Sequence, residues 1–198
     1  MKKTNQRVFK VREFLHIIHL AGVAFPMLKD AKKRKRFSKQ LKERIMLSVT
    51  NVNGCELCSY VHTKIALKSG LEASEIKALL GGEKEQIKEE DLIAMLFAEH
   101  FASSKESPDK EIIDRLIKTY GEERANLILA STVMISLTNA IGITLHLLKN
   151  RILFKRDKRS TFIGEIGILS LIPYAGLQLL FGRLFRNPRK EKLVAKFA

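Results

Sequence analysis

The stretch LILASTVMISLTNAIGITLHLL, residues 127–148, decides the fold. Its 22 residues contain a single ionisable side chain, His146, so the stretch is long and apolar enough to cross a bilayer. Six hydroxyl and amide side chains interrupt it, however, and we therefore expect a core helix that other helices surround on all sides.

Outward from this stretch, apolar residues recur at three- and four-residue spacing, and no segment alternates between apolar and polar residues with a period of two. Toward the N-terminus, this pattern predicts a helix from Val8 that ends near Pro26, because proline interrupts helical hydrogen bonding. The turn residues Asn53 and Gly54 end a second helix, and Gly121 ends a later one. The spacing therefore predicts an all-α fold.

Charge is distributed unevenly along the chain. The net charge is +15; residues 1–44 carry 14 Lys and Arg against 3 Asp and Glu, and residues 149–198 carry 12 against 3. The segment between them carries 10 against 15. We therefore predict three parts: a basic N-terminal helical arm at 1–37, a helical core domain at 38–150, and a basic, partly apolar C-terminal extension at 151–198.

The chain has two cysteines, Cys55 and Cys58, separated by two residues. Two cysteines cannot supply the several disulfides of a small secreted domain, and residues 1–14 lack the continuous apolar region of a signal peptide. These features predict a cytoplasmic protein, in which a vicinal cysteine pair usually has a catalytic or a metal-binding role.

The sequence around the pair places four reactive side chains, Glu43, Cys55, Cys58 and His62, within 20 residues. If a helix begins at about Cys55, the cysteines lie in its first turn, where a disulfide can form and unpaired N–H groups stabilise a thiolate. His62 is one turn beyond Cys58, where its imidazole can stabilise the thiolate or pass a proton. Glu43 completes a proton relay if the preceding helix packs antiparallel.

This pattern of Glu, eleven residues, and then Cys-x-x-Cys-x-x-x-His resembles the signature of the AhpD-like alkylhydroperoxidases in the carboxymuconolactone decarboxylase superfamily. The segment KIALKSGLEASEIKALLGG, residues 64–82, is similar to the family's continuation after the cysteine helix. Later segments, including Asn139 in the central stretch, are similar too, so the resemblance covers roughly residues 38–150.

The resemblance implies an all-α helical bundle that assembles into trimers or hexamers and acts as an antioxidant oxidoreductase without a cofactor. Cys58 would attack a hydroperoxide, Cys55 would resolve the product as a disulfide, and Glu43 and His62 would move protons. A lipoyl or thioredoxin-like dithiol would then reduce the pair. One position departs from some family members, which have a histidine before the second cysteine where this chain has Leu57.

Other interpretations of these residues remain open. Zinc would find three ligands in Cys55, Cys58 and His62, one fewer than a tetrahedral site needs. Glu43 could instead be a surface carboxylate paired with Lys39 or Lys42. The superfamily's decarboxylase chemistry is disfavoured, since those members generally lack the pair. A rival of another class is a non-enzymatic adaptor for a membrane or nucleic acid.

The C-terminal extension contains 17 consecutive residues without a charge, 166–182, between the basic cluster 155–159 and Arg183, Arg186, Arg189 and Lys190. This arrangement suits a helix or hairpin that rests peripherally on an anionic membrane, and a terminal helix that packs on an oligomer is the open alternative. The run AKKRKR, residues 31–36, fits a solvated helix face as well as a nucleic-acid site, so we disfavour nucleic acid as a partner.

Overall fold

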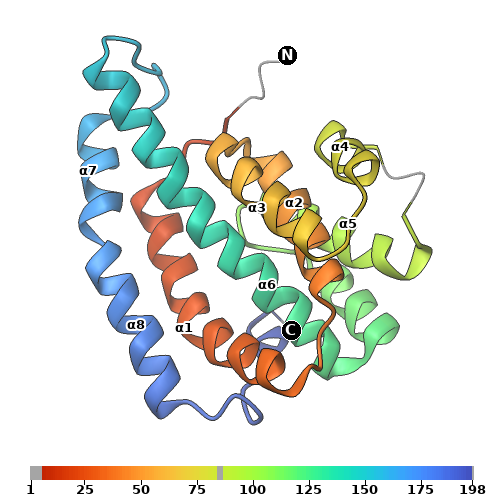
Figure 1. Ribbon diagram of the computed structural model, residues 1–198. Coiled ribbons are helices and arrows are strands. Elements are labelled where there is room, and N and C mark those ends of the chain that lie inside the picture. Colours follow the sequence, from red (N-terminus) through yellow and green to blue (C-terminus); the bar gives the residue numbers. More distant parts are fainter. Residues whose placement is uncertain (1–5, 84–86, 198) are drawn as a thin grey trace.

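The computed structural model describes residues 6–83 and 87–197. Within these ranges the chain is helical and has no strand, which confirms the predicted all-α fold (Figure 1). The elements are α1 (Val11–Arg34), α2 (Lys39–Asn53), α3 (Glu56–Lys68), α4 (Ala73–Gly81), α5 (Glu89–Ser103), α6 (Lys110–Ile152), α7 (Phe162–Ser170), α8 (Ile172–Phe185) and a short 3-10 helix, Val194–Lys196.

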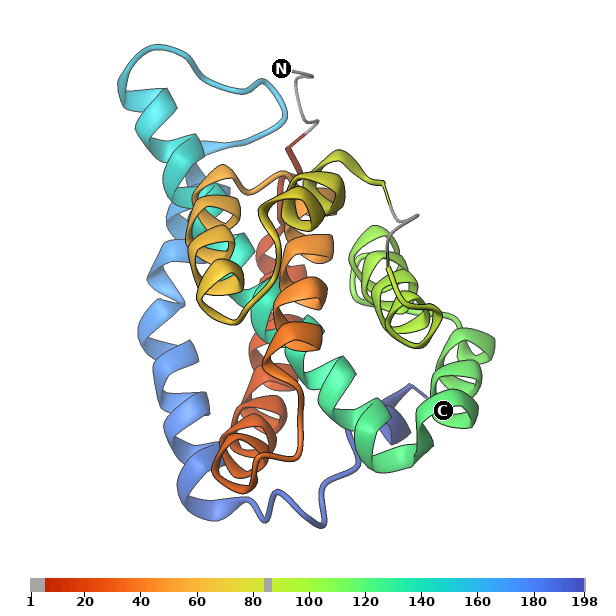
Figure 2. The ribbon, with the colours of Figure 1, turned by 45° about the vertical axis from the view of Figure 1, so that its right-hand side comes forward.

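Helix α6 is the centre of the bundle, and α1, α2, α3, α5 and α7 all pack against it (Figures 1 and 2). It has 43 residues and kinks at Gly121, whose φ of 73° is outside the helical range. The predicted break at Gly121 is therefore a kink that joins two helical pieces. Beyond it, 83% of the most apolar window of α6 is buried inside the protein, which confirms that residues 127–148 form a core helix.

Helix α1 lies along α6, and its side chains Phe14, Ile17 and Ile18 are fully buried. The segment that we placed in an N-terminal arm thus contributes to the core, and contacts also join α7 to α6. The boundaries after residues 37 and 150 stay predictions.

The predicted end of the first helix near Pro26 is wrong, because α1 continues to Arg34. Proline has no N–H to donate to the carbonyl four residues earlier, which here belongs to Gly22. That carbonyl faces Gly182 of α8, at a point where any side chain on residue 182 would overlap it. Packing on both sides of α1 therefore maintains the helix across its proline.

A smaller apolar cluster joins α3 to α2, α4 and α5. It consists of Leu47, Ala66, Leu71, Ile76, Leu79 and Met95, from α2 to α5. Of the α3 side chains, only Cys58 and Ala66 are buried. Helix α3 is therefore a surface helix held at its first turn and near its end.

Among the residues that the structure describes, three segments are long and apolar enough to cross a membrane by length and composition: α1, α6, and α7 with α8. Their burial differs sharply, at 56%, 83% and 17% of the apolar window. Helices α7 and α8 form one edge of the molecule in both ribbon views and keep most of their apolar surface exposed (Figures 1 and 2).

Candidate redox site

The turn between α2 and α3 brings the predicted site residues together. Helix α2 ends at Gly54 in the left-handed conformation, with φ of 69°. The carbonyl of Thr50 accepts hydrogen bonds from the backbone N–H groups of Gly54, at 2.9 Å, and Cys55, at 3.3 Å. A side chain at Gly54 would also lie 3.0 Å from Cα of Gln6, so this turn requires glycine in both conformation and space.

Cys55 and Cys58 form a disulfide at the start of α3, with their Cα atoms 5.3 Å apart. Cys55 is the N-cap residue, and the backbone N–H of Cys58 donates to its Sγ at 3.4 Å. The exposed fractions are 2% for Cys55 and 7% for Cys58. The pair therefore occupies the helix terminus that the spacing predicted, just below the protein surface.

Helix α6 forms the floor of the site at a residue that the sequence analysis did not single out. A Cβ on Gly142 would lie 3.1 Å from Sγ of Cys55 and 3.3 Å from Sγ of Cys58. The carbonyl oxygen of Thr138, one turn earlier, is 3.8 Å from Sγ of Cys58. Gly142 is the one glycine within residues 127–148. A glycine inside a helical stretch is the sequence signal that could have indicated a close contact at this position.

Glu43 and His62 are joined across the two helices, with Oε2 of Glu43 2.7 Å from Nδ1 of His62. Glu43 is only 1% exposed, so the alternative of a surface carboxylate is wrong, although Lys42 does pair with it at 3.1 Å. The structure thus brings the predicted acid and imidazole into direct contact one helical turn beyond Cys58.

The charge state of Glu43 follows from its surroundings. Burial favours the neutral acid, but the hydrogen bond from His62 and the charge of Lys42 outweigh it and hold the pKa of Glu43 below its ordinary value. A carboxylate accepts hydrogen bonds and cannot donate them. We therefore assign the proton of the short contact to Nδ1 of His62, which leaves Nε2 free to exchange a proton in the neutral imidazole.

Buried polar groups lie on both α2 and α6. Thr50 donates from its hydroxyl to Oδ1 of Asn139 at 3.2 Å, which ties the turn to α6. Four buried side-chain atoms of these two helices lack a hydrogen-bond partner within the described structure: Ser48 Oγ, Asn53 Nδ2, Ser136 Oγ and Asn139 Nδ2. Asn139, noted in the sequence only for its resemblance, is therefore a structural neighbour of the site.

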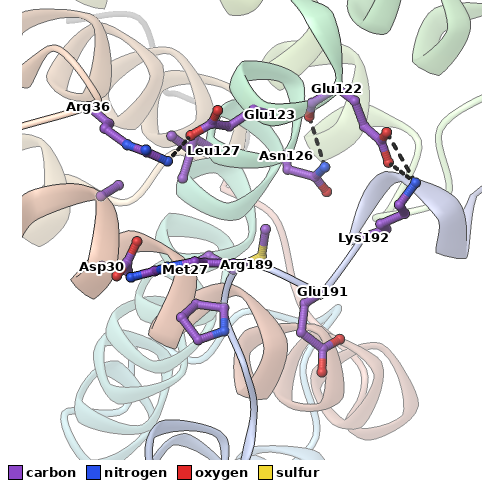
Figure 3. A pocket seen from close by; sticks show the side chains of 12 residues that line it. Met27, Asp30, Arg36, Glu122, Glu123, Asn126, Leu127, Arg189, Glu191 and Lys192 are labelled. Carbon is purple, nitrogen blue, oxygen red and sulfur yellow. Dashed lines mark hydrogen bonds and ion pairs between the residues drawn. The ribbon is translucent and has the colours of Figure 1, made fainter. Parts of the chain in front are cut away.

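Across residues 6–83 and 87–197, no three His, Cys, Asp or Glu side chains come together in a group that could hold a metal ion. A surface pocket, shown in Figure 3, is lined by other residues, among them Met27, Asn126 and Arg189, and includes neither cysteine. Exposed ion pairs, Arg36 with Glu123 and Lys192 with Glu122, lie at its rim. Such exposed pairs contribute little stability, and no residue of the candidate site lines this pocket.

A sequence model of the carboxymuconolactone decarboxylase family matches residues 23–83, a segment that contains Glu43, Cys55, Cys58 and His62. This match confirms the resemblance seen in the sequence, and the Cys55–Cys58 disulfide fits the AhpD-like branch of the family, which has a cysteine pair. The match begins inside α1, earlier than the expected residue 38. No curated protein and no solved structure matches the chain.

Proposed function

We propose that this protein is a thiol-dependent peroxidase whose Cys55–Cys58 pair alternates between dithiol and disulfide. The observation that carries the proposal is the 2.7 Å contact between Glu43 and His62, one turn from a cysteine pair at a helix N-terminus. A buried carboxylate that orients an imidazole beside a thiol is an arrangement for moving protons during nucleophilic attack.

In the oxidative half-reaction, the thiolate of Cys58 attacks one oxygen of a hydroperoxide and breaks the O–O bond. Cys58 becomes a sulfenic acid, and the alkoxide leaves as an alcohol after it receives the proton that His62 took from the thiol. The thiol of Cys55 then attacks the Cys58 sulfur, which forms the disulfide and releases water. The peroxide is reduced by two electrons, and the two thiols are oxidised by two.

In the reductive half-reaction, an external dithiol of the lipoyl or thioredoxin-like class attacks the disulfide and leaves as a disulfide itself. Cys58 is the more exposed of the two sulfur-bearing residues, which supports attack at its sulfur. The reductant, the trimer or hexamer and the cytoplasmic location stay predictions from the sequence.

Intact-mass measurement of the reduced protein after one equivalent of hydroperoxide tests the proposal. The parent protein should lose two hydrogens, and Cys55→Ser should gain one oxygen that a sulfenic-acid reagent captures. Cys58→Ser should remain unmodified. If Cys58→Ser gained the oxygen and Cys55→Ser did not, Cys55 would be the attacking cysteine and Cys58 the resolving one. A parent protein that keeps both thiols would contradict peroxidase activity.

A dithiol exchange assay separates the peroxidase from a plain disulfide reductase. Both activities need the pair, but Glu43→Gln and His62→Asn should slow the peroxide step more than the exchange step, because alkoxide departure needs a proton. Equal slowing of both steps would favour the disulfide reductase.

A further inference from the structure

Helices α7 and α8 present an apolar face that nothing in the described structure covers. They follow each other almost without interruption from Phe162 to Phe185, a segment of 24 residues. We call the exposed side of this segment the outer face, and it consists of Phe162, Ile163, Ile166, Leu177, Leu180, Phe181, Leu184 and Phe185. In both ribbon views the segment lies at the outside of the molecule (Figures 1 and 2).

The opposite side of the segment is fixed to the bundle. The phenol of Tyr174 is 2.9 Å from Nε2 of His19 in α1, and Gly182 packs against the backbone of Gly22. Ile168 and Ala175 are buried on this side. The segment is therefore attached along its length, and only its outer face is available to another molecule.

The single acidic residue of the segment is turned away from the outer face. Glu165 is 2% exposed and accepts two hydrogen bonds from Arg151, both at 2.8 Å, and one from Ser160 at 2.7 Å. Since residues 166–182 contain no charge, the outer face is uncharged between its two ends.

Both ends of the outer face are basic and exposed. Lys155, Arg156 and Lys158 precede α7, and Arg183, Arg189 and Lys190 are in or after the end of α8. The nearby acids are engaged with arginines, Asp157 with Arg159 and Glu191 with Arg186. The surface is thus an apolar band between two cationic clusters.

This charge pattern selects among the occupants that an apolar face can have. A second copy packed face to face would place basic clusters against basic clusters in either orientation, because both ends carry the same sign. An anionic bilayer instead matches the pattern, since acyl chains take the apolar band and lipid phosphates take the cations. Docking parallel to the membrane follows from the attachment of the inner side to α1.

We propose that the α7–α8 outer face docks on a bilayer that contains anionic phospholipid. The segment then lies along the surface of the membrane, with the basic clusters at its ends among the headgroups. This inference does not depend on the redox proposal, because none of the four candidate site residues lies in the segment.

Flotation of the full-length protein with vesicles tests the proposal. The protein should float with phosphatidylcholine vesicles that contain phosphatidylserine, and binding should fall when salt rises from about 0.1 M to about 1 M, which shortens the screening length from about 10 Å to about 3 Å. Neutral phosphatidylcholine vesicles should bind at least about tenfold less.

Two pairs of variants separate the apolar and the cationic contributions. Leu177→Glu with Leu184→Glu should lower binding by about tenfold or more, whereas Leu67→Glu with Leu96→Glu, at exposed leucines on α3 and α5, should not. Lys155→Glu with Lys158→Glu should also lower binding by about tenfold or more. The control, Lys77→Glu with Lys118→Glu, makes the same change in charge at exposed positions outside the segment and should not lower binding as much.

Several results would overturn the proposal. Absence of flotation, equal binding to neutral vesicles, or equal losses in variants and controls would each do so. Sedimentation should also find no self-association that depends on Leu177 and Leu184, since such a dimer would mean that a second copy covers the outer face. Cys58→Ser should float like the parent protein, so that failure of this proposal and failure of the redox proposal are distinguishable.

Discussion

Gly142 of α6 lies directly against the Cys55 sulfur, at a distance where a single methyl group would be 3.1 Å from Sγ. The absence of a side chain at residue 142 is therefore what lets the disulfide pack on the central helix. This contact joins residues more than 80 positions apart and sets how deeply the pair sits.

Gly142→Ala should disturb the oxidised site. Because the added methyl group would meet both sulfurs at tight distances, we expect a loss of about 1–3 kcal/mol in the free energy of unfolding. Urea unfolding of the oxidised parent protein and variant measures this loss of stability. The control is Gly176→Ala in α8, where nothing lies within 4 Å of the new methyl group and better helix propensity should stabilise by about 0.5–1 kcal/mol. Equal effects of the two changes would contradict the tight contact.

Glu43→Gln should destabilise the protein at neutral pH by about 1–3 kcal/mol, because it weakens a buried, charge-assisted contact with His62. The pKa of Glu43 is lower in the folded protein than its ordinary 4.5, so the folded state binds the proton more weakly than the unfolded state. Ionised Glu43 thus stabilises the fold above that pH, and its contribution is lost as the pH falls through the folded pKa.

Unfolding curves of the parent protein and Glu43→Gln between neutral and acidic pH check this expectation. The gap in stability should be widest near neutrality and should narrow once the pH falls below 4.5. Glu111→Gln, an exposed carboxylate in the first turn of α6, is the matched control and should change stability little at any pH. A gap that stays constant on acidification would mean that the charge of Glu43 is not what stabilises the site.

Gly182→Ala should displace α8 from α1, because the methyl group would overlap the backbone carbonyl of Gly22, which cannot rotate away. We expect a loss of about 1–3 kcal/mol. Hydrogen exchange should accelerate in residues 172–185 more than in α6. Gly176→Ala, six residues earlier and free of contacts, should leave exchange in α8 as slow as in the parent protein or slower.

Local signals in the sequence predicted much of the site. Asn53 and Gly54 indicated the turn, and the left-handed φ of Gly54 shows why the chain needs glycine there. The spacing of Glu43 and His62 around that turn predicted that they meet, and they are 2.7 Å apart. Turn chemistry and helical period act over a few residues, so they can be recognised without knowing the partners of each helix.

Long-range contacts overrode one local rule and left another intact. Pro26 predicted the end of a helix, but packing between α6 and α8 carries α1 past it to Arg34. Gly121 also predicted an end, and its φ of 73° does interrupt the helix, because two helical pieces meet there at a kink. At Pro26, burial of the flanking helix outweighs the local cost of an interrupted hydrogen bond.

By itself the sequence determined the all-α fold, the turn after α2 and the cysteine pair at the first turn of α3, because backbone hydrogen bonding and side-chain period are local properties. The tertiary structure alone decided that Gly142 faces the sulfurs, that Glu43 is buried and ionised, and that α7 and α8 leave an apolar face uncovered. Those features depend on which helices pack together, and packing is settled by burial summed over residues far apart in the chain.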